Sequence, residues 1–271
     1  MTSNLLEHGY DEMLSTVLEK ADGTVYVVNP SRSALEQFIE AAAERDTLPG
    51  VRVLAGERTL KDVMDDFIVA STAADLLQRE VLQLRTLEEP PENALVLTEA
   101  ETVAVVRAGD RVAGLTTDDA EFVEAAWDAY ETAWDGATEF SLRTPPISTV
   151  RETLSSDIGP DAEEDFSSIL ASLETARGNG EGLDEVTISL LVAARNEALL
   201  YDISKWGEDI GIASKATFSR TKTRLEDMGL IDTEKVPIDV GRPRLRLKIA
   251  DERLREADDS QLATVAQSLL T

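Results

Sequence analysis

The sequence predicts an α/β domain over residues 1–145 and a smaller α+β domain over residues 183–250. In the first part, short β-branched runs alternate with segments whose apolar residues recur every three or four positions. This pattern is typical of a parallel sheet covered by helices. In the second part, three helical segments precede two strand segments that flank a turn-rich tip. Residues 146–182 are expected to form a helical connector, and residues 251–271 a C-terminal helix.

The first half of the α/β domain is predicted to contain two strand–helix units. In chain order, the segments are a helix over 5–18, a strand over 24–29, a helix capped by Ser31 or Ser33 and running through Ala42, a strand over 51–54, and a helix capped by Thr59 and running to about Glu80. Serine and threonine are favoured at such caps because their hydroxyl oxygens accept a free backbone N–H. The repetition predicts parallel strands joined by helices.

The second half of this domain is expected to close the sheet with an antiparallel meander. Strands are predicted over 81–86, 94–98, 102–107 and 111–115, with a turn at Gly109-Asp110. Thr117 is expected to cap an acidic helix that carries Trp127, Tyr130 and Trp134.

The connector is predicted to contain two short helices, over 150–156 and 163–177. A glycine-rich joint at 177–182 then marks the expected domain boundary. A last helix is predicted over 258–270, where apolar residues again fall at helical spacing.

Three helices are predicted in the C-terminal domain, over 184–196, 202–210 and 214–228. Gly211-Ile212-Ala213 separates the last two by a tight turn. Two helices joined by a short turn that contains glycine form a helix-turn-helix, whose second helix enters the major groove of DNA. The helix over 214–228 is therefore the candidate recognition helix.

The two strands that follow predict a wing. Residues 231–236 form the first strand, and residues 244–249 alternate between an apolar face and a basic face that carries Arg244, Arg246 and Lys248. A basic strand face can contact phosphates beside the groove. Between the strands, Arg242 either enters a narrow minor groove or belongs to a simple connecting turn, and the sequence leaves both open.

Charge is unevenly distributed along the chain. The net charge is -27, from 53 Asp+Glu against 26 Lys+Arg. Residues 211–249 contain nine bases and five acids, so this segment carries +4 and the other residues carry -31. A basic stretch that coincides with the helix, turn and wing favours DNA as the partner.

The acidity of the rest of the chain favours a cytoplasm of high salt concentration. Only 7 of the 26 bases are lysine, and 42% of the residues are hydrophobic, so a normally packed core with excess surface carboxylate is expected. Molar salt screens the repulsion between such carboxylates within about 3 Å. An acidic protein with a basic partner is the alternative.

These patterns predict a sequence-specific DNA-binding transcription regulator. A winged helix that docks another protein, without specific DNA binding, is the alternative, and the local basic charge favours DNA. The candidate DNA-binding residues lie on the recognition helix and the wing: Ser214, Lys215, Thr217, Ser219, Arg220, Lys222, Thr223, Arg224, Arg242, Arg244 and Arg246.

The segment from Ile210 to Arg220, continued by Leu225 to Ile231, resembles archaeal winged-helix regulators. Residues 93–97, the Gly109-Asp110 turn and the helix over 127–134 resemble the effector domain of TrmB-like regulators. The resemblance implies a phospholipase-D-like fold for that domain, a role in sensing sugars, and control of sugar metabolism in a haloarchaeon. Here the sensor precedes the DNA-binding domain, so no sugar-contacting residue of the family is carried over.

Catalysis is not expected. A phospholipase-D-like enzyme needs a His-x-Lys motif, and the single histidine, His8, is followed by Gly9 and Tyr10. With one histidine and no cysteine, the sequence indicates no thiol nucleophile, no metal site and no cofactor. It also shows no signal peptide and no membrane-spanning stretch, so a cytoplasmic protein is expected.

A small-molecule effector, either a sugar or a sugar phosphate, is expected beyond the carboxyl ends of the strands, where open α/β sheets bind ligands. The candidate effector-binding residues there are Asn29, Ser31, Arg32, Gly56 and Arg58. The helix N-terminus at Ser31 or Ser33 can attract an anion, and ordinary capping is the alternative. A homodimer is also predicted, because the aromatic helix and residues 262–270 offer apolar stripes and two-fold operators require two-fold proteins.

Overall fold

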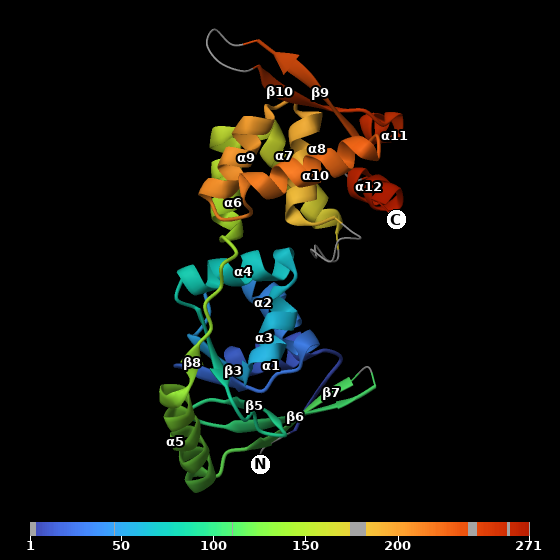
Figure 1. The fold of residues 1–271 in the computed structure, drawn as a ribbon. Coiled ribbons are helices and arrows are strands. Elements are labelled where there is room, and N and C mark those ends of the chain that lie inside the picture. Colours follow the sequence, from blue (N-terminus) through green and yellow to red (C-terminus); the bar gives the residue numbers. More distant parts are fainter. Residues whose placement is uncertain are drawn as a thin grey trace. The chain divides into compact units, whose positions relative to one another are not determined.

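A computed structural model describes residues 4–45, 47–109, 111–173, 183–237, 243–258 and 261–270 (Figure 1). Contacts between Cα atoms divide the chain into two compact units. The first unit comprises residues 1–64 and 72–142, and the second comprises residues 65–71 and 143–271. The predicted joint at 177–182 lies outside the described residues.

The first unit is built on a sheet of eight strands in the order β1-β7-β6-β5-β2-β3-β4-β8. The strands are β1 (Leu5–Glu7), β2 (Val25–Val28), β3 (Val51–Gly56), β4 (Leu82–Leu87), β5 (Ala94–Leu97), β6 (Thr102–Ala108), β7 (Arg111–Thr117) and β8 (Thr138–Glu139). β2, β3 and β4 are parallel, whereas β5, β6, β7 and β1 continue from β2 as antiparallel neighbours. The predicted strand–helix repeat followed by a meander is therefore confirmed, except that β4, which was expected in the meander, is parallel to β3.

Helices cover both faces of this sheet (Figure 1). The covering helices are α1 (Tyr10–Leu18), α2 (Arg32–Ala43), α3 (Glu57–Met64) and α5 (Ala120–Gly136). A further helix, α4 (Phe67–Gln78), follows α3, and its first residues belong to the second unit. The aromatic stripe of α5 packs onto the sheet, where Trp127 and Trp134 contact the ring of Tyr26 edge-on. Trp134 is buried, whereas Trp127 and Tyr130 are half-buried and Phe122 is 55% exposed, so the chain itself covers only part of the stripe.

Three local predictions differ from the structure. Leu5 and Leu6 belong to strand β1, which pairs with β7, so the N-terminal helix begins only at Tyr10. Thr59 lies inside α3, which begins at Glu57. Asp119, and not Thr117, caps α5 through a hydrogen bond from the Phe122 N–H at 3.0 Å.

The second unit is mainly helical. Its helices are α6 (Ile147–Asp157), α7 (Pro160–Ser172), α8 (Glu185–Arg195), α9 (Leu200–Asp209), α10 (Lys215–Asp227), α11 (Glu252–Glu256) and α12 (Leu262–Leu270). α8 is buried along most of its length, from Val186 to Ala194, and forms the centre of the core. Leu262, Ala263 and Ala266 of α12 are buried in the same core, so the terminal apolar stripe is also used within the chain.

Two antiparallel strands, β9 (Ile231–Val236) and β10 (Arg244–Ile249), follow α10 in this unit. On its other side, β10 makes a single bridge from Arg246 to Leu199, and the Leu247 N–H donates to the Ala198 carbonyl at 2.9 Å. β10 is thus held between β9 and the start of α9. The tip residues 238–242, including Arg242, lie outside the described residues.

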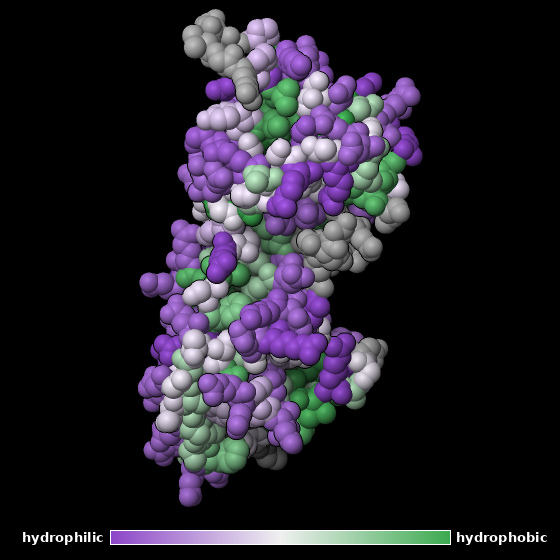
Figure 2. Space-filling view, viewed as in Figure 1, coloured by the Kyte–Doolittle hydropathy of each residue, from purple (hydrophilic) through white to green (hydrophobic). Residues whose placement is uncertain are grey.

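Hydrophilic residues dominate the face of the molecule shown in Figure 2, as the composition predicted. Among the described residues, no helix has the length and apolar character needed to cross a bilayer.

Candidate nucleic-acid interface

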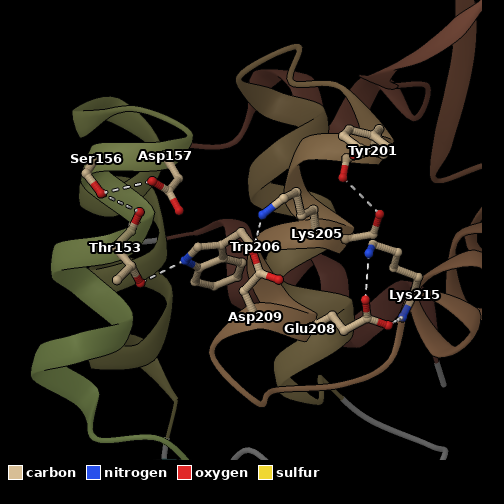
Figure 3. Close-up of polar contacts among 10 residues, drawn as sticks. Thr153, Ser156, Asp157, Tyr201, Lys205, Trp206, Glu208, Asp209 and Lys215 are labelled. Carbon is tan, nitrogen blue, oxygen red and sulfur yellow. Dashed lines mark hydrogen bonds and ion pairs between the residues drawn. The ribbon is translucent and has the colours of Figure 1, made fainter.

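The position of α10 depends on one aromatic contact with α9. Phe218 of α10 is fully buried, and a Cβ built on Gly207 of α9 would overlap its ring. Glycine at 207 therefore lets the two helices approach closely. The neighbouring Trp206 is also buried, and its indole N–H donates to the Thr153 Oγ1 of α6 at 2.9 Å (Figure 3). α9 is thus fixed by contacts with both α6 and α10.

The turn between α9 and α10 has the predicted backbone conformation. Gly211 has a φ of 88°, in the left-handed region that favours glycine. The Ile212 N–H donates to the Gly207 carbonyl at 2.8 Å. Ser214 caps α10, since its Oγ accepts the Thr217 N–H at 3.2 Å. The helix-turn-helix geometry is therefore confirmed.

One face of α10 is polar and open to solvent. Its exposed candidate residues are Ser214, Lys215, Ser219, Arg220 and Thr223, with Thr217 half-buried beside them. Arg220 forms no ion pair with any residue that the structure describes, and its guanidinium lies 3.4 Å from the Thr217 Oγ1. Arg220 is thus a cation available to a ligand.

Two candidate residues of α10 are not on this face. The side chain of Lys222 is only 13% exposed, and its Nζ lies 2.6 Å from Glu226 Oε2. Arg224 is half-buried, and its guanidinium donates to the Thr187 Oγ1 of α8 at 3.0 Å. Both basic residues therefore make contacts within their own domain.

The outer face of the wing is less basic than predicted. The register places Arg246 opposite Glu234 and Lys248 opposite Asp232, so acids from β9 face the bases of β10. The Lys248 Nζ lies 2.5 Å from Glu234 Oε2. The sequence of β10 alone does not indicate these acidic neighbours, because the register between β9 and β10 decides which residues of the two strands lie opposite each other.

A groove of about 460 Å³ lies between α10 and the wing. It is lined by Leu200, Tyr201, Ser204, Lys215, Ser219, Pro243, Arg244 and Leu245. Tyr201 is 48% exposed, and the Arg244 guanidinium lies 4.5 Å from the centre of its ring. Sequence reasoning missed Tyr201, because its position beside β10 depends on pairing between residues far apart in the chain. Cationic and hydroxyl groups that converge in this way are typical donors to DNA phosphates.

Carboxylates accompany the two bases of this groove. The Lys215 Nζ lies 2.6 Å from Glu208 Oε2, as Figure 3 shows, and Arg244 Nη1 lies 3.3 Å from Asp202 Oδ1. The hydrogen bond from Lys215 lowers the pKa of Glu208, and the same bond raises the pKa of Lys215. The groove therefore carries less net positive charge than its bases alone would give it.

The five candidate effector residues of the first unit have different local contacts. Ser31 caps α2, Asn29 Nδ2 donates to the Pro91 carbonyl at 2.5 Å, and Arg32 pairs with Glu36 at 2.8 Å. The other two residues lie at the end of β3 and just after it. Gly56 is the last residue of β3, and Arg58 lies on α3 with its side chain 94% exposed.

One of these residues, Ser31, lines a cavity of about 250 Å³. The other lining residues are His8, Gly9, Tyr10, Ser33, Ala34, Gln37, Ala94, Val105, Arg107 and Val112. Arg107 Nη1 donates to Ser33 Oγ at 3.1 Å, so a cation and two hydroxyls meet at the N-terminus of α2. Among the described residues, no three His, Cys, Asp or Glu side chains are arranged to hold a metal ion.

Two family profiles together match nearly the whole chain. Residues 2–145 match the N-terminal domain of "Transcriptional regulator TbsP-like" proteins, and residues 146–267 match the C-terminal HTH domain of the same family. The chain belongs to the TbsP-like transcriptional regulators. Its helix-turn-helix is therefore that of a transcription regulator, in agreement with the TrmB-related resemblance seen in the sequence.

Solved structures give only distant similarities to this TbsP-like chain. One match is TrmBL2, described as an archaeal chromatin protein that "shows a novel mode of DNA binding", with 15% identity and a TM-score of 0.36. It covers 51% of this chain and 54% of TrmBL2, so the chain spans about half of that protein. Another is NucT from Helicobacter pylori, with 11% identity, a TM-score of 0.33, and coverage of 51% of this chain and 99% of NucT. Among curated proteins, no sequence matches.

Proposed function

We propose that the chain is a sequence-specific DNA-binding transcription regulator that places α10 in the major groove and the β9–β10 wing on the adjacent backbone. One observation carries the proposal: the only face of α10 that its own domain leaves open, within the described residues, presents Lys215, Ser219, Arg220 and Thr223 beside the wing groove. Side chains of these types donate to base edges and phosphates.

Genome-wide crosslinking of the tagged protein to DNA tests this proposal. Sharp peaks at promoters, followed by binding of the purified protein to the same fragments, are expected. Binding that does not distinguish these fragments from random duplex would contradict sequence specificity.

A protein-docking role without specific DNA binding is the second candidate. The acids that face the wing bases favour it, because they reduce the attraction of the wing for phosphates. Co-purified proteins together with an absence of promoter peaks would support this alternative over the first.

The first unit is proposed to sense an effector, a sugar or sugar phosphate, and so to link the regulator to sugar metabolism. The cavity at the N-terminus of α2 supports this, since Ser31, Ser33 and Arg107 offer donors to hydroxyls or to a phosphate. Thermal shift with a panel of sugars and sugar phosphates is the test, with an Arg107→Met variant as control. A shift that persists in this variant would place the effector elsewhere.

We also propose that the first unit has a phospholipase-D-like fold, that the protein is not a catalyst, and that it forms a homodimer. The resemblance to TrmB-like regulators supports the first. The lack of a His-x-Lys motif, since His8 is followed by Gly9 and Tyr10, supports the second. The two-fold symmetry of typical operators supports the third.

A further inference from the structure

The basic side chains that line the proposed DNA groove form ion pairs with carboxylates of the same domain. Lys215 is the first residue of α10, and its Nζ contacts Glu208 Oε2 of α9 at 2.6 Å. Both side chains are partly exposed, 44% for Lys215 and 43% for Glu208, so the pair lies at the surface where DNA would approach. A phosphate that binds Lys215 must share it with this carboxylate.

Glu208 is fixed in place by a second bond. Its Oε1 accepts the backbone N–H of Lys215 at 3.2 Å, so it satisfies one of the free N–H groups at the start of α10. This bond positions the carboxylate beside the helix N-terminus independently of the lysine side chain. The pair is thus a built feature of the helix-turn-helix, and not a chance contact between two long side chains.

The second basic residue of the groove, Arg244, also pairs with a carboxylate of α9. Arg244 of β10 contacts Asp202 of α9 at 3.3 Å and stacks on Tyr201. Both acids belong to α9 and both bases lie on the elements proposed to contact DNA. Arg220, in contrast, forms no ion pair with the described residues and lies on the open face of α10.

We infer that Glu208 and Asp202 reduce the contribution of DNA phosphates to the binding affinity, because they cancel the attraction of Lys215 and Arg244 for phosphates. Contacts from Arg220, which has no ion pair among the described residues, and from its neighbours to the nucleobases of DNA then contribute most of the binding. This inference rests on the proposed function, since it requires DNA in the groove. Attraction to phosphates supplies nearly all sequence-independent binding and makes it sensitive to salt. A groove whose basic side chains are already held in ion pairs therefore binds random DNA weakly, and its affinity for DNA changes little with salt concentration.

The test measures affinity against salt for the full-length protein and the Glu208→Gln and Asp202→Asn variants. Fluorescence anisotropy with a promoter fragment and with random duplex is recorded from 0.1 M to 1 M KCl, with circular dichroism to confirm the fold. Glutamine keeps an oxygen that accepts the Lys215 N–H, so the cap of α10 is preserved. Each neutralised phosphate adds about 0.9 to the slope of log K against log salt. Each variant should therefore gain about eightfold more affinity than wild type between 1 M and 0.1 M KCl.

Asp227→Asn is the matched control, because it removes the same charge at the far end of α10. Asp227 lies about 18 Å from Lys215 along the helix axis, at 1.5 Å per residue, which exceeds the screening length of about 10 Å at 0.1 M salt. The slope of log K against log salt for Asp227→Asn should therefore equal that of the wild type. A slope for Glu208→Gln that is no steeper than that of Asp227→Asn would overturn the inference.

A double-mutant cycle tests the pair directly. Lys215→Met should cost little affinity in the wild type, where Glu208 already neutralises the lysine, and more in the Glu208→Gln background. Equal losses in both backgrounds would overturn the inference. Wild-type protein that binds no DNA at any salt concentration would instead contradict the proposed function, so the two failures are distinguishable.

Discussion

At the scale of single residues, Arg220 is the side chain on which sequence recognition is expected to depend. It projects from the open face of α10 and has no carboxylate partner among the described residues. A guanidinium that makes paired hydrogen bonds to guanine contributes about 1–3 kcal/mol of discrimination. We expect Arg220→Ala to weaken binding to the best site by this amount and to relax the preference at one position, as measured by selection from a randomised duplex pool.

The companion variant is Lys215→Ala. Its effect should be small, because Glu208 already pairs with the lysine, and equal for all sequences, because lysine at the helix start contacts phosphate and not nucleobases. If Arg220→Ala left the selected sequence unchanged, another part of α10 would face the base edges.

Other residues of the site had no signal in the sequence. Lys222 and Arg224 are the same residue types as the exposed Lys215 and Arg220, yet they contact Glu226 and Thr187. A one-residue step along a helix turns the side chain by about 100°, so neighbouring bases have different environments. The pairing of Lys215 with Glu208 likewise depends on how two helices meet.

At the scale of elements, the α9–α10 contact is the feature that fixes the recognition helix. A Cβ at position 207 would overlap the buried ring of Phe218. We expect Gly207→Ala to lower the free energy of unfolding of the second unit by about 1–3 kcal/mol, the usual range for overpacking. Urea titration measures it, followed by circular dichroism and by tryptophan fluorescence, to which Trp206 contributes together with Trp127 and Trp134 of the first unit.

Gly136→Ala is the control for this prediction. Gly136 ends α5, and no described atom lies within 4 Å of a Cβ built there. Alanine at this helical position should leave stability unchanged or slightly raised. Equal effects of the two substitutions would show that the helix contact is looser than the structure indicates.

At the scale of the whole molecule, the chain is expected to associate as a homodimer. The apolar stripes of α5 and α12 are partly covered within their own units: Trp134 and Ala266 are buried, whereas Phe122 is 55% exposed. The expectation rests on operator symmetry. Light scattering in molar KCl should give twice the mass of 29.5 kDa. A monomer at micromolar concentration, both with and without promoter DNA, would contradict it.

The net charge of -27 predicts that folding depends on salt. Carboxylates spread over the surface repel one another in the compact state, and added ions screen this repulsion. We expect the urea midpoint of unfolding to rise steadily from 0.1 M to 2 M KCl. A neutral osmolyte at matched osmolality should have a smaller effect. A midpoint independent of KCl would argue against a high-salt environment.

The sequence by itself determined the order of elements and their chemical character. Alternating apolar residues, turn glycines such as Gly211 and Gly229, and capping residues such as Ser31 and Ser214 act over a few neighbouring positions, so they could be read directly. The basic stretch of the wing was visible for the same reason. These signals sufficed to predict the α/β part and the helix-turn-helix, whereas the family followed from a resemblance to known regulators.

Tertiary structure decided which of those residues meet. Leu5 and Leu6 fit a helical pattern but pair with β7, because the hydrogen bonds of a sheet join residues far apart in the chain. The same holds for the acids opposite the wing bases, for Glu208 beside Lys215, and for Arg107 beside Ser33. Register and helix packing are set by the whole core, and a local pattern carries no information about them.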